Sequence, residues 1–374
     1  MTRAPVLVHR FVTDLPNRFT GVATATGREA MMSERASIRD VAIRAGVSPT
    51  TVSHVLNNTP GTRTSEKTRA RVHAAAAELG YSANAVARAL RTRRSDSVGF
   101  VGDEIATTPF AGKLILGAQE VVRQHDGVLL VTNTSYDAEL ENREIRELLS
   151  RDIDGVLYAA MYHRVVTVPA SLHGAPVVVL NARTTDDRSW VSPDEYAGGE
   201  DAAQVLIDAG HRRLAMIGNA DPIPAASGRP AGFLARAAAA GIPAEDVTVV
   251  YVSPTAGHAA EAAMRLLDRP DRPTGLFCFN DLMAMGAYNS ARRLGLRIPD
   301  DLSVVGFDDL AILSAAVDPA LTTVALPHLE MGAWAAEQLY VEIAARATGQ
   351  PSPVRHAELR GEVVHRASVG SPPR

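Results

Sequence analysis

The sequence predicts two kinds of structure in one chain: a small module of short helices, followed by a much larger α/β body. Between Ser37 and Gly80, apolar residues recur at helical spacing, and residues that cap or end helices separate them. After Arg94, short apolar runs alternate with helical patterns, which is typical of parallel α/β units. The distribution of charge separates the same two regions.

Charge changes sign at the boundary between them. Residues 33–94 contain eleven Lys or Arg and four Asp or Glu, a net charge of +7, and the first 32 residues carry +2. Because the whole chain carries −4, the residues after Arg94 sum to −13. A basic module in front of an acidic body indicates a polyanionic partner at one end and a different role for the rest.

The composition is that of an ordinary globular protein of two or three domains, with 374 residues, 46% of them hydrophobic. The single cysteine, Cys278, cannot form an internal disulfide, and we expect it to be inert core. No apolar run reaches the ~18 residues of a membrane span. The N-terminal VLVHRFV is too short for a signal peptide. We therefore expect a cytoplasmic protein with no membrane partner.

Two short helices are predicted at the start of the basic module. The first covers Ile38 to Ala45, with Ser37 as its N-cap and Gly46 at its end. Ser48 caps the second, which opens with Pro49, a position where the missing N–H costs nothing. Three of its side chains face inward at helical spacing, namely Val52, Val55 and Leu56. Four face outward, namely Pro49, Thr50, Ser53 and His54. This is the helix-turn-helix pattern.

A third helix is predicted from a cap at Ser65 to Leu79, with Gly80 after it. The stretch YSANAVARALRTRR follows, and it has helical character and an arginine cluster at its end. Alone it would be marginal, since an isolated helix needs ~12–15 residues in water. We therefore expect it to become ordered only against a partner.

The body contains seven predicted strands separated by helical patterns. Ligands of open parallel sheets bind beyond the carboxyl ends of the strands, so the loops after them are the candidate binding positions. The strand sequences are SVGFVG, VLLVT, GVLYAA, PVVVL, RLAMIG, TGLFCF and LSVVGF.

The segments SIRDVAIRAGVSPTTVSHVLN and TSEKTRARVHAAAAELGYSANAVARALR resemble the DNA-binding headpiece and hinge of the LacI/GalR family of bacterial transcriptional regulators. The resemblance continues through the body in RDIDGVLYA, AGHRRLAMIG, RPAGF, FNDLMAMGA and IPDDLSVVGFDDL, and it covers nearly everything from Ser37 to Arg366. It implies a fold: an α-helical helix-turn-helix headpiece plus an α/β two-lobed effector domain that is similar to type I periplasmic binding proteins. Three crossovers would link the lobes, with a ligand cleft between them.

On this resemblance we expect four segments. Residues 1–36 are an N-terminal extension, 37–82 the headpiece, 83–95 the hinge helix and linker, and 96–370 the effector-binding and dimerisation domain. The extension contains Met31 and Met32 directly before the headpiece. We expect translation to begin at one of these methionines, or else the extension to be a flexible arm.

The second helix carries the candidate DNA-reading residues. Thr50 and His54 lie one turn apart, so both can point into a major groove, where a Thr hydroxyl can pair with several base edges. Many family members carry Arg where this chain has His54, and His cannot bond guanine bidentately, so operator preference should differ. The alternative is that His54 is exposed without a base partner. Pro49 can make only apolar contact, and Thr51 and Ser53 would position the helix on phosphates. Ser37 is a further candidate DNA-binding residue.

Leu90 lies in a segment that resembles the family's hinge helix. The resemblance implies that two copies of this leucine wedge into the minor groove and kink it, while Arg91 and the arginines after it neutralise phosphates. The alternative is that Leu90 packs on the body. Ala83 stands where the family usually has Pro, which would make the chain entry less rigid.

Four positions match effector-pocket positions of the family. Phe110 could stack on a sugar or base, and Asn181 follows PVVVL. Arg229 begins a helix and could hold hydroxyls bidentately. Asp281 could accept two sugar hydroxyls, or it could serve as a helix N-cap.

Two features depart from the family pattern, and a third, a pair of acids, lies in a motif that matches it. Val252 stands where family pockets often have a large aromatic, which puts one stacking platform in doubt. Asp194-Glu195 replaces the usual Asp-Asn pair. Asp308-Asp309 lies in a motif that is structural in the family, so we do not expect a catalytic acid pair there.

We therefore expect a transcriptional repressor that binds a palindromic double-stranded DNA operator as a homodimer or a tetramer. A small-molecule effector would control it, a sugar or a derivative; a nucleoside or a phosphorylated metabolite stays open, as does the direction of the response. No catalytic motif is present, so we expect no enzyme, no cofactor and no metal. The alternatives are a regulator that responds to no ligand and, less favoured, a solute-binding protein.

Overall fold

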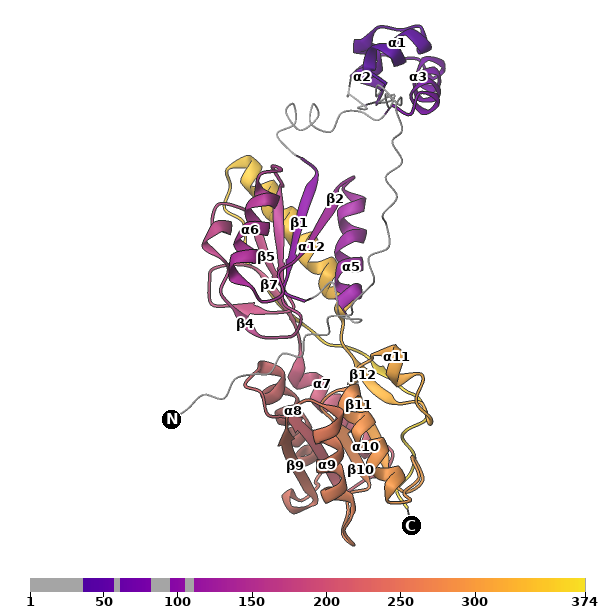
Figure 1. The fold of residues 1–374 in the computed structure, drawn as a ribbon, viewed down its shortest axis with the longest axis vertical. Helices are drawn as coiled ribbons and strands as arrows, with labels where there is room; N and C mark the ends of the chain where they lie inside the picture. The colour runs from indigo at the N-terminus through magenta and orange to yellow at the C-terminus, as the bar shows by residue number, and fades with distance from the viewer. Residues whose placement is uncertain (1–35, 57–60, 82–94, 105–110, 374) are drawn as a thin grey trace, which may run out of the picture. The chain divides into compact units, whose positions relative to one another are not determined.

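The computed structural model describes residues 36–56, 61–81, 95–104 and 111–373. The chain divides into two compact units, Met1–Asn84 and Ala85–Arg374. We call the described part of the first unit the headpiece and that of the second the body (Figure 1). Within the described residues, no helix is long and apolar enough to cross a membrane.

The headpiece contains the three helices that the sequence predicts: α1 (Ile38–Ala45), α2 (Pro49–Leu56) and α3 (Glu66–Glu78). Each predicted cap is present. Ser37 and Asp40 form a reciprocal capping box, and the Thr51 and Thr68 N–H groups donate to the Ser48 and Ser65 hydroxyls. The three helices bury one small core, made of Val41, Ala42, Ala45, Val52, Val55, Val72, Ala75 and Ala76.

The turn between α1 and α2 is held from α3. Gly46 has a φ of +62°, which a glycine adopts without strain. The Arg71 guanidinium donates to the carbonyl oxygen of Ala45 at 2.6 Å and to that of Gly46 at 3.3 Å. These bonds satisfy carbonyls at the end of α1 and fix the direction in which α2 leaves the turn.

The body has two lobes, each built on a six-stranded sheet. The N-lobe sheet has the order β13-β7-β5-β3-β1-β2, and all of its pairs are parallel. Its strands are β1 (Ser97–Gly102), β2 (Val128–Asn133), β3 (Gly155–Ala159), β5 (Val177–Leu180), β7 (Trp190–Pro193) and β13 (His356–Leu359). A separate two-stranded sheet pairs β4 (Val165–Val166) with β6 (Arg183–Thr184).

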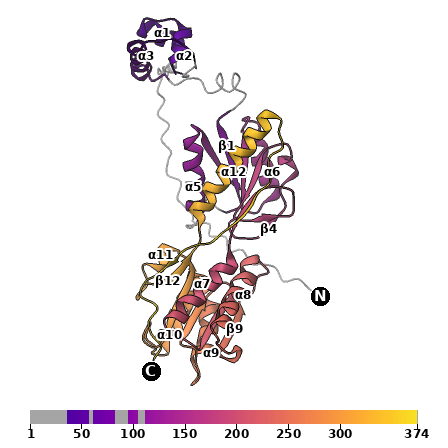
Figure 2. The same ribbon diagram turned by 180° about the vertical axis from the view of Figure 1, so that it is seen from behind.

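Helices cover both faces of the N-lobe sheet. On one face α5 (Ala111–Gln124) and α12 (His328–Thr348) pack together, and Figure 2 shows α12 running along the sheet. On the other face lies α6 (Ala138–Leu149), which buries Ile145 and Leu148. A short 3-10 helix, Ala170–Leu172, packs beside α6.

The C-lobe sheet has the order β14-β12-β11-β10-β8-β9, parallel except for the β12–β14 pair. Its strands are β8 (Leu214–Asn219), β9 (Val247–Val252), β10 (Gly275–Cys278), β11 (Ser303–Asp308), β12 (Thr322–Ala325) and β14 (Val363–Val364). Its helices are α7 (Glu195–Asp208), α8 (Pro224–Ala239), α9 (Ala256–Leu267), α10 (Asp281–Arg293) and α11 (Ala311–Ser314), with a 3-10 helix at Ala244–Asp246. α7 packs with α8, and α9 with α10.

The chain passes between the lobes three times. It leaves the N-lobe between β7 and α7, returns between β12 and α12, and leaves again between β13 and β14. All seven predicted strands are present, and the core position of Cys278 is confirmed by its complete burial. The sequence analysis missed β7, β9, β12, β13 and three two-residue strands.

Candidate nucleic-acid interface and ligand cleft

The outward face of α2 presents the residues that the sequence singled out. Pro49 and Thr50 are exposed, and Ser53 and His54 are half-buried, whereas Val52 is buried in the core. Thr50 and His54 are separated by one helical turn, so they share a face. This face can contact base edges in a groove.

The hydroxyls at the helix starts already have partners inside the headpiece. Ser37 Oγ donates to Asp40 Oδ2 at 2.7 Å. The side-chain and backbone hydrogen bonds from Ser37 lower the pKa of the Asp40 carboxyl. Thr51 Oγ1 lies 2.9 Å from Ser48 Oγ. Ser37 and Thr51 therefore serve as parts of helix caps.

Three of the predicted site residues lie outside the described part of the chain: Leu90, Arg91 and Phe110. Ala83 lies outside it as well. Their assigned roles stay predictions.

In the body, the predicted effector residues lie at the carboxyl edges of the two sheets. Asn181 directly follows β5 in the N-lobe, is buried and has a φ of +56°. Its side-chain amide donates to the carbonyl oxygens of Ala160 at 2.9 Å and Met161 at 3.2 Å. Asn181 therefore ties the loop after β5 to the loop after β3.

Arg229 lies inside α8, so the prediction that it begins a helix was wrong. The helix starts five residues earlier, at Pro224. Arg229 is 4% exposed, and its Nη1 donates to the carbonyl oxygen of Phe279 at 2.5 Å. Its guanidinium carbon lies 3.6 Å from the centre of the Phe307 ring and 4.3 Å from that of Phe279. These contacts fix the orientation of the side chain.

Glu195 is the partner of Arg229, and the sequence analysis noted it only as a departure from the family. Arg229 Nε donates to Glu195 Oε2 at 2.7 Å, and His163 Nδ1 lies 3.3 Å from Glu195 Oε1. Burial opposes ionisation, but Arg229 and His163 outweigh it and lower the pKa of the Glu195 carboxyl. His163 belongs to the N-lobe, so Glu195 joins the lobes at the first crossover.

Asp281 is buried at the start of α10, and it is not the N-cap of that helix. Asn280 caps the helix, because its side chain accepts from the Met283 N–H. Asp281 Oδ1 accepts from the Thr323 hydroxyl at 2.6 Å, and Oδ2 accepts from the Leu310 N–H at 2.7 Å. Burial raises the pKa of Asp281 to about 6.

Asp308 and Asp309 follow, both with positive φ. Asp309 pairs with Arg366 at 2.7 Å, whereas Asp308 Oδ1 lies 3.5 Å from Arg229 Nη1. Burial is the main cause that raises the pKa of Asp308 to about 8, and Arg229 offsets part of it. A cavity of about 210 Å³ lies beside these acids, lined by Lys113, His328 and residues 308–312. It spans both lobes, because Lys113 lies on α5.

The N-lobe edge holds a second arginine that the sequence analysis missed. Arg164 lies in the loop after β3, with Nη2 2.8 Å from Asp103 Oδ2. Its guanidinium lies over the rings of Tyr136 and Tyr162, at 5.2 Å and 5.4 Å from their centres. Both tyrosines are exposed and follow predicted strands, a signal that could have identified them.

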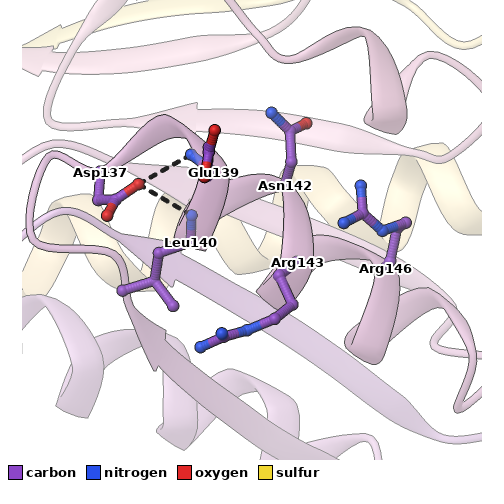
Figure 3. A pocket seen from close by; sticks show the side chains of 6 residues that line it. All are labelled: Asp137, Glu139, Leu140, Asn142, Arg143 and Arg146. Atoms are coloured by element: carbon purple, nitrogen blue, oxygen red, sulfur yellow. Dashed lines mark hydrogen bonds between the residues drawn. The ribbon is translucent and has the colours of Figure 1, made fainter.

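A larger surface hollow, of about 660 Å³, lies over the start of α6. Asp137 caps the helix there by accepting from the Glu139 and Leu140 N–H groups (Figure 3). Figure 3 shows the Asn142 and Arg143 side chains pointing in different directions. Because its polar groups do not converge, we assign no site to this hollow.

Comparison with known proteins identifies the family. A family model described as periplasmic binding proteins and sugar binding domain of the LacI family matches residues 95–358. A second, described as bacterial regulatory proteins of the lacI family, matches residues 37–84. The chain belongs to the LacI family. It is therefore a DNA-binding transcriptional regulator with a periplasmic-binding-protein-like effector domain.

Two named regulators illustrate the relationship. The chain is 34% identical over 304 residues to the HTH-type transcriptional regulator DegA of Bacillus subtilis, covering 80% of this chain and 89% of DegA. It is 31% identical over 344 residues to the HTH-type transcriptional repressor PurR of Pectobacterium carotovorum, covering 90% of this chain and 98% of PurR.

Solved structures agree. A putative LacI-family regulator from Rhizobium etli superposes with a TM-score of 0.66 at 32% identity, covering 74% of this chain and all of that one. The complex of the transcriptional regulator CelR with cellobiose superposes with a TM-score of 0.58 at 28% identity, covering 89% of this chain and all of CelR.

Proposed function

We propose that this chain is a repressor that binds a palindromic operator as a homodimer, and that a small molecule in the interlobe cleft controls its affinity for DNA. The observation that carries the proposal is the combination, in one LacI-family chain, of an exposed polar face on α2 with converging polar side chains at the carboxyl edges of two lobes. The name of the relative PurR supports the repressor role. Because the target is chromosomal DNA, we place the protein in the cytoplasm.

On the operator, α2 enters the major groove. Thr50 and His54 contact base edges, and Pro49 contributes apolar contact. The helix is positioned on phosphates by Thr51, Ser53 and Ser37. The contacts use the atoms of these residues that are not engaged in helix caps. In the hinge, Leu90 wedges into the minor groove and Arg91 binds phosphate.

In the cleft, the effector contacts the carboxyl edges of both sheets. Arg229, Asp281 and Asn181 hold its polar groups or the loops around it, and Phe110 supplies an apolar face. Tyr136 and Tyr162 supply the stacking surface that Val252 does not. A sugar is the effector class that we propose, supported by the cellobiose complex of CelR.

Effector binding would act on DNA through the two lobes. Glu195 connects His163 of the N-lobe with Arg229 of the C-lobe at the first crossover. A ligand that binds one arrangement of the lobes better than another shifts the equilibrium between them, and thereby the DNA affinity of the paired headpieces.

The experiment that tests the proposal is a footprint of the purified protein on its own promoter, with and without a panel of sugars. We expect a salt-dependent footprint on a palindrome that one sugar strengthens or weakens. A protein that protects no site would contradict the repressor role.

A second candidate is a regulator that responds to no small molecule. The observation that favours it is that Arg229 and both carboxylate oxygens of Asp281 already have partners inside the protein. A footprint that no sugar changes would support this candidate and leave the DNA-binding part of the proposal intact.

A further inference from the structure

The first turn of the DNA-reading helix α2 lies outside the headpiece core. The core contacts of α2 begin at Val52, which is buried together with Val55, and Leu56 packs against the core in part. Pro49 and Thr50, in the first turn, are exposed. The position of this first turn therefore depends on the turn between α1 and α2.

That turn is short, and α3 supplies part of its hydrogen bonding. Two residues, Gly46 and Val47, separate α1 from Ser48, whose hydroxyl caps α2. Arg71 of α3 donates to the carbonyl oxygen of Ala45 from Nε, at 3.2 Å, and from Nη2, at 2.6 Å, and Nη2 also donates to that of Gly46 at 3.3 Å. One guanidinium thus holds two successive carbonyl groups directly before α2.

The shape of the guanidinium and its place on α3 both suit this role. Its N–H donors lie in one rigid plane, so two neighbouring donors fix the direction of the carbonyls that they bind, whereas the donors of a lysine rotate about a single nitrogen. Arg71 directly precedes Val72, which is completely buried in the headpiece core. The packing of α3 therefore also fixes where the guanidinium lies.

A second arginine connects α1 with α3 through a side-chain ion pair. Arg44 Nη2 lies 2.7 Å from Glu78 Oε1, and both side chains are more than half exposed. An exposed pair of this kind contributes little to stability or orientation. The two arginines thus differ in what they bind, because Arg44 pairs with a side chain and Arg71 bonds to the backbone of the turn.

We propose that Arg71 is a positioning residue for operator recognition: it fixes the turn, and thereby the direction of α2, and so determines how well the protein distinguishes its operator from other DNA. The inference rests on the proposed function, since it requires that Thr50 and His54 read base edges. A base-reading side chain must be held to within about 0.5 Å of its productive position. Binding to phosphates depends mainly on charge. A displaced first turn should therefore reduce discrimination more than it reduces binding to random DNA.

The first test compares Arg71→Met with Arg44→Met in the full chain, by anisotropy of a labelled promoter fragment and of random DNA of equal length. Each substitution removes one positive charge and one connection between α1 and α3, so each should weaken binding to both DNAs by a similar factor. Arg71→Met alone should also lower the ratio of the two affinities, by about ten-fold, since it displaces base contacts. A partly unfolded headpiece would not change this ratio, because both DNAs bind the folded form.

The outcomes separate the inference from the function on which it rests. If the wild type prefers the promoter and Arg71→Met keeps that preference to within about two-fold, the inference alone is wrong. An equal fall of the ratio in Arg44→Met would also overturn it, because any connection between α1 and α3 would then serve as well. A wild type that binds both DNAs equally would contradict operator reading itself, and the inference with it.

Arg71→Lys separates the charge of the side chain from its geometry. Lysine keeps the charge, so the affinity for random DNA and its salt dependence should stay at the wild-type level. Lysine lacks the planar fork, so the ratio of affinities should lie between those of the wild type and Arg71→Met. Wild-type discrimination in Arg71→Lys, with equal losses on both DNAs in Arg71→Met, would show that Arg71 acts through its charge and would overturn the proposal.

A final measurement needs no DNA. The Thr51 N–H donates to the Ser48 hydroxyl at 3.1 Å, and the Val52 N–H donates to the Ser48 carbonyl oxygen at 3.1 Å. Hydrogen exchange at these two amides therefore reports on the first turn of α2. We expect it to be faster in Arg71→Met than in Arg44→Met under the same conditions. Equal exchange in the two variants would mean that Arg71 does not hold the turn, and the proposal would be wrong.

Discussion

The polar side chains of the headpiece and those of the cleft differ in how accessible they are to a partner. On α2, Thr50 is exposed and His54 half-buried, on a face that a partner can reach. In the cleft, Arg229, Glu195 and Asp281 are buried and bound to other groups of the protein. A surface that reads DNA leaves hydrogen-bonding groups for the partner, whereas a closed cleft must satisfy its charged groups before a ligand comes.

The largest effect that we expect comes from breaking the buried pair. Arg229→Met leaves Glu195 buried without its cation, which should lower the free energy of unfolding of the body by about 3–5 kcal/mol. Urea unfolding followed by tryptophan fluorescence measures this, because Trp190 and Trp334, the two tryptophans of the chain, both lie in the body.

The matched control removes both charges. Arg229→Met combined with Glu195→Met should recover most of the loss, since an apolar pair of similar size needs no compensation. A loss of about 1 kcal/mol or less in the single variant, typical of surface ion pairs, would contradict the buried pair.

Changes on α2 should affect DNA binding and leave stability intact. Thr50→Ala and His54→Ala should each weaken operator binding by about 1–3 kcal/mol, because on the proposed function each removes a base contact. The free energy of unfolding should stay within about 0.5 kcal/mol of the wild type. Fluorescence anisotropy with the promoter fragment measures the first quantity. Equal losses on random DNA would show that these side chains bind phosphate and do not read sequence.

The acids of the cleft should make stability depend on pH. The pKa of Asp308, about 8, is raised above its ordinary value of 3.8, so folding favours its protonated form. Its contribution to stability is therefore complete below about pH 4 and is lost as the pH rises to about 8. Asp308→Asn should flatten the fall of the melting temperature between pH 5 and 8.

Two comparisons check the assignment of that slope. Asp281, whose pKa is about 6, acts in the same direction over a lower range. Glu195, whose pKa is lowered, acts in the opposite direction and loses its contribution as the pH falls below its ordinary value of 4.5. If the melting temperatures of the wild type and of Asp308→Asn depend on pH in the same way, groups other than Asp308 cause the fall between pH 5 and 8.

The smallest effect concerns the cap of α1. Ser37→Ala removes the capping box with Asp40 and should destabilise the headpiece by about 1 kcal/mol. Hydrogen exchange of the α1 amides measures this loss separately from the body. Unchanged exchange would mean that packing alone holds the start of the helix.

The two regions also differ in how far the sequence predicted them. The bounds of α1 and its cap at Ser37 were predicted correctly because the signals lie within a few neighbouring residues. In the cleft, Glu195 and Arg229 are 34 positions apart, and Arg229 and Asp308 are 79 apart. No local pattern specifies such pairs, so the sequence could flag Glu195 as unusual but could not name its partner.

The local errors have local causes. Arg229 was placed at a helix start because the Pro224 signal, a proline at the first helical position, went unused. The cap of α10 was offered as a role for Asp281 because Asn280 and Asp281 are adjacent and both are good capping residues. Which of the two residues caps the helix depends on the backbone conformation, which the sequence does not show.

The central claim is that the exposed face of α2 reads an operator and that the buried cleft controls its affinity. The most direct measurement is anisotropy of a labelled promoter fragment titrated with the full chain, over a range of salt concentrations, with and without one sugar of the panel at a time. We expect a preference for the promoter over random DNA, a steep loss of affinity with salt, and a change of about ten-fold or more on adding the sugar. Equal affinity for both DNAs, unaffected by every sugar, would contradict the account.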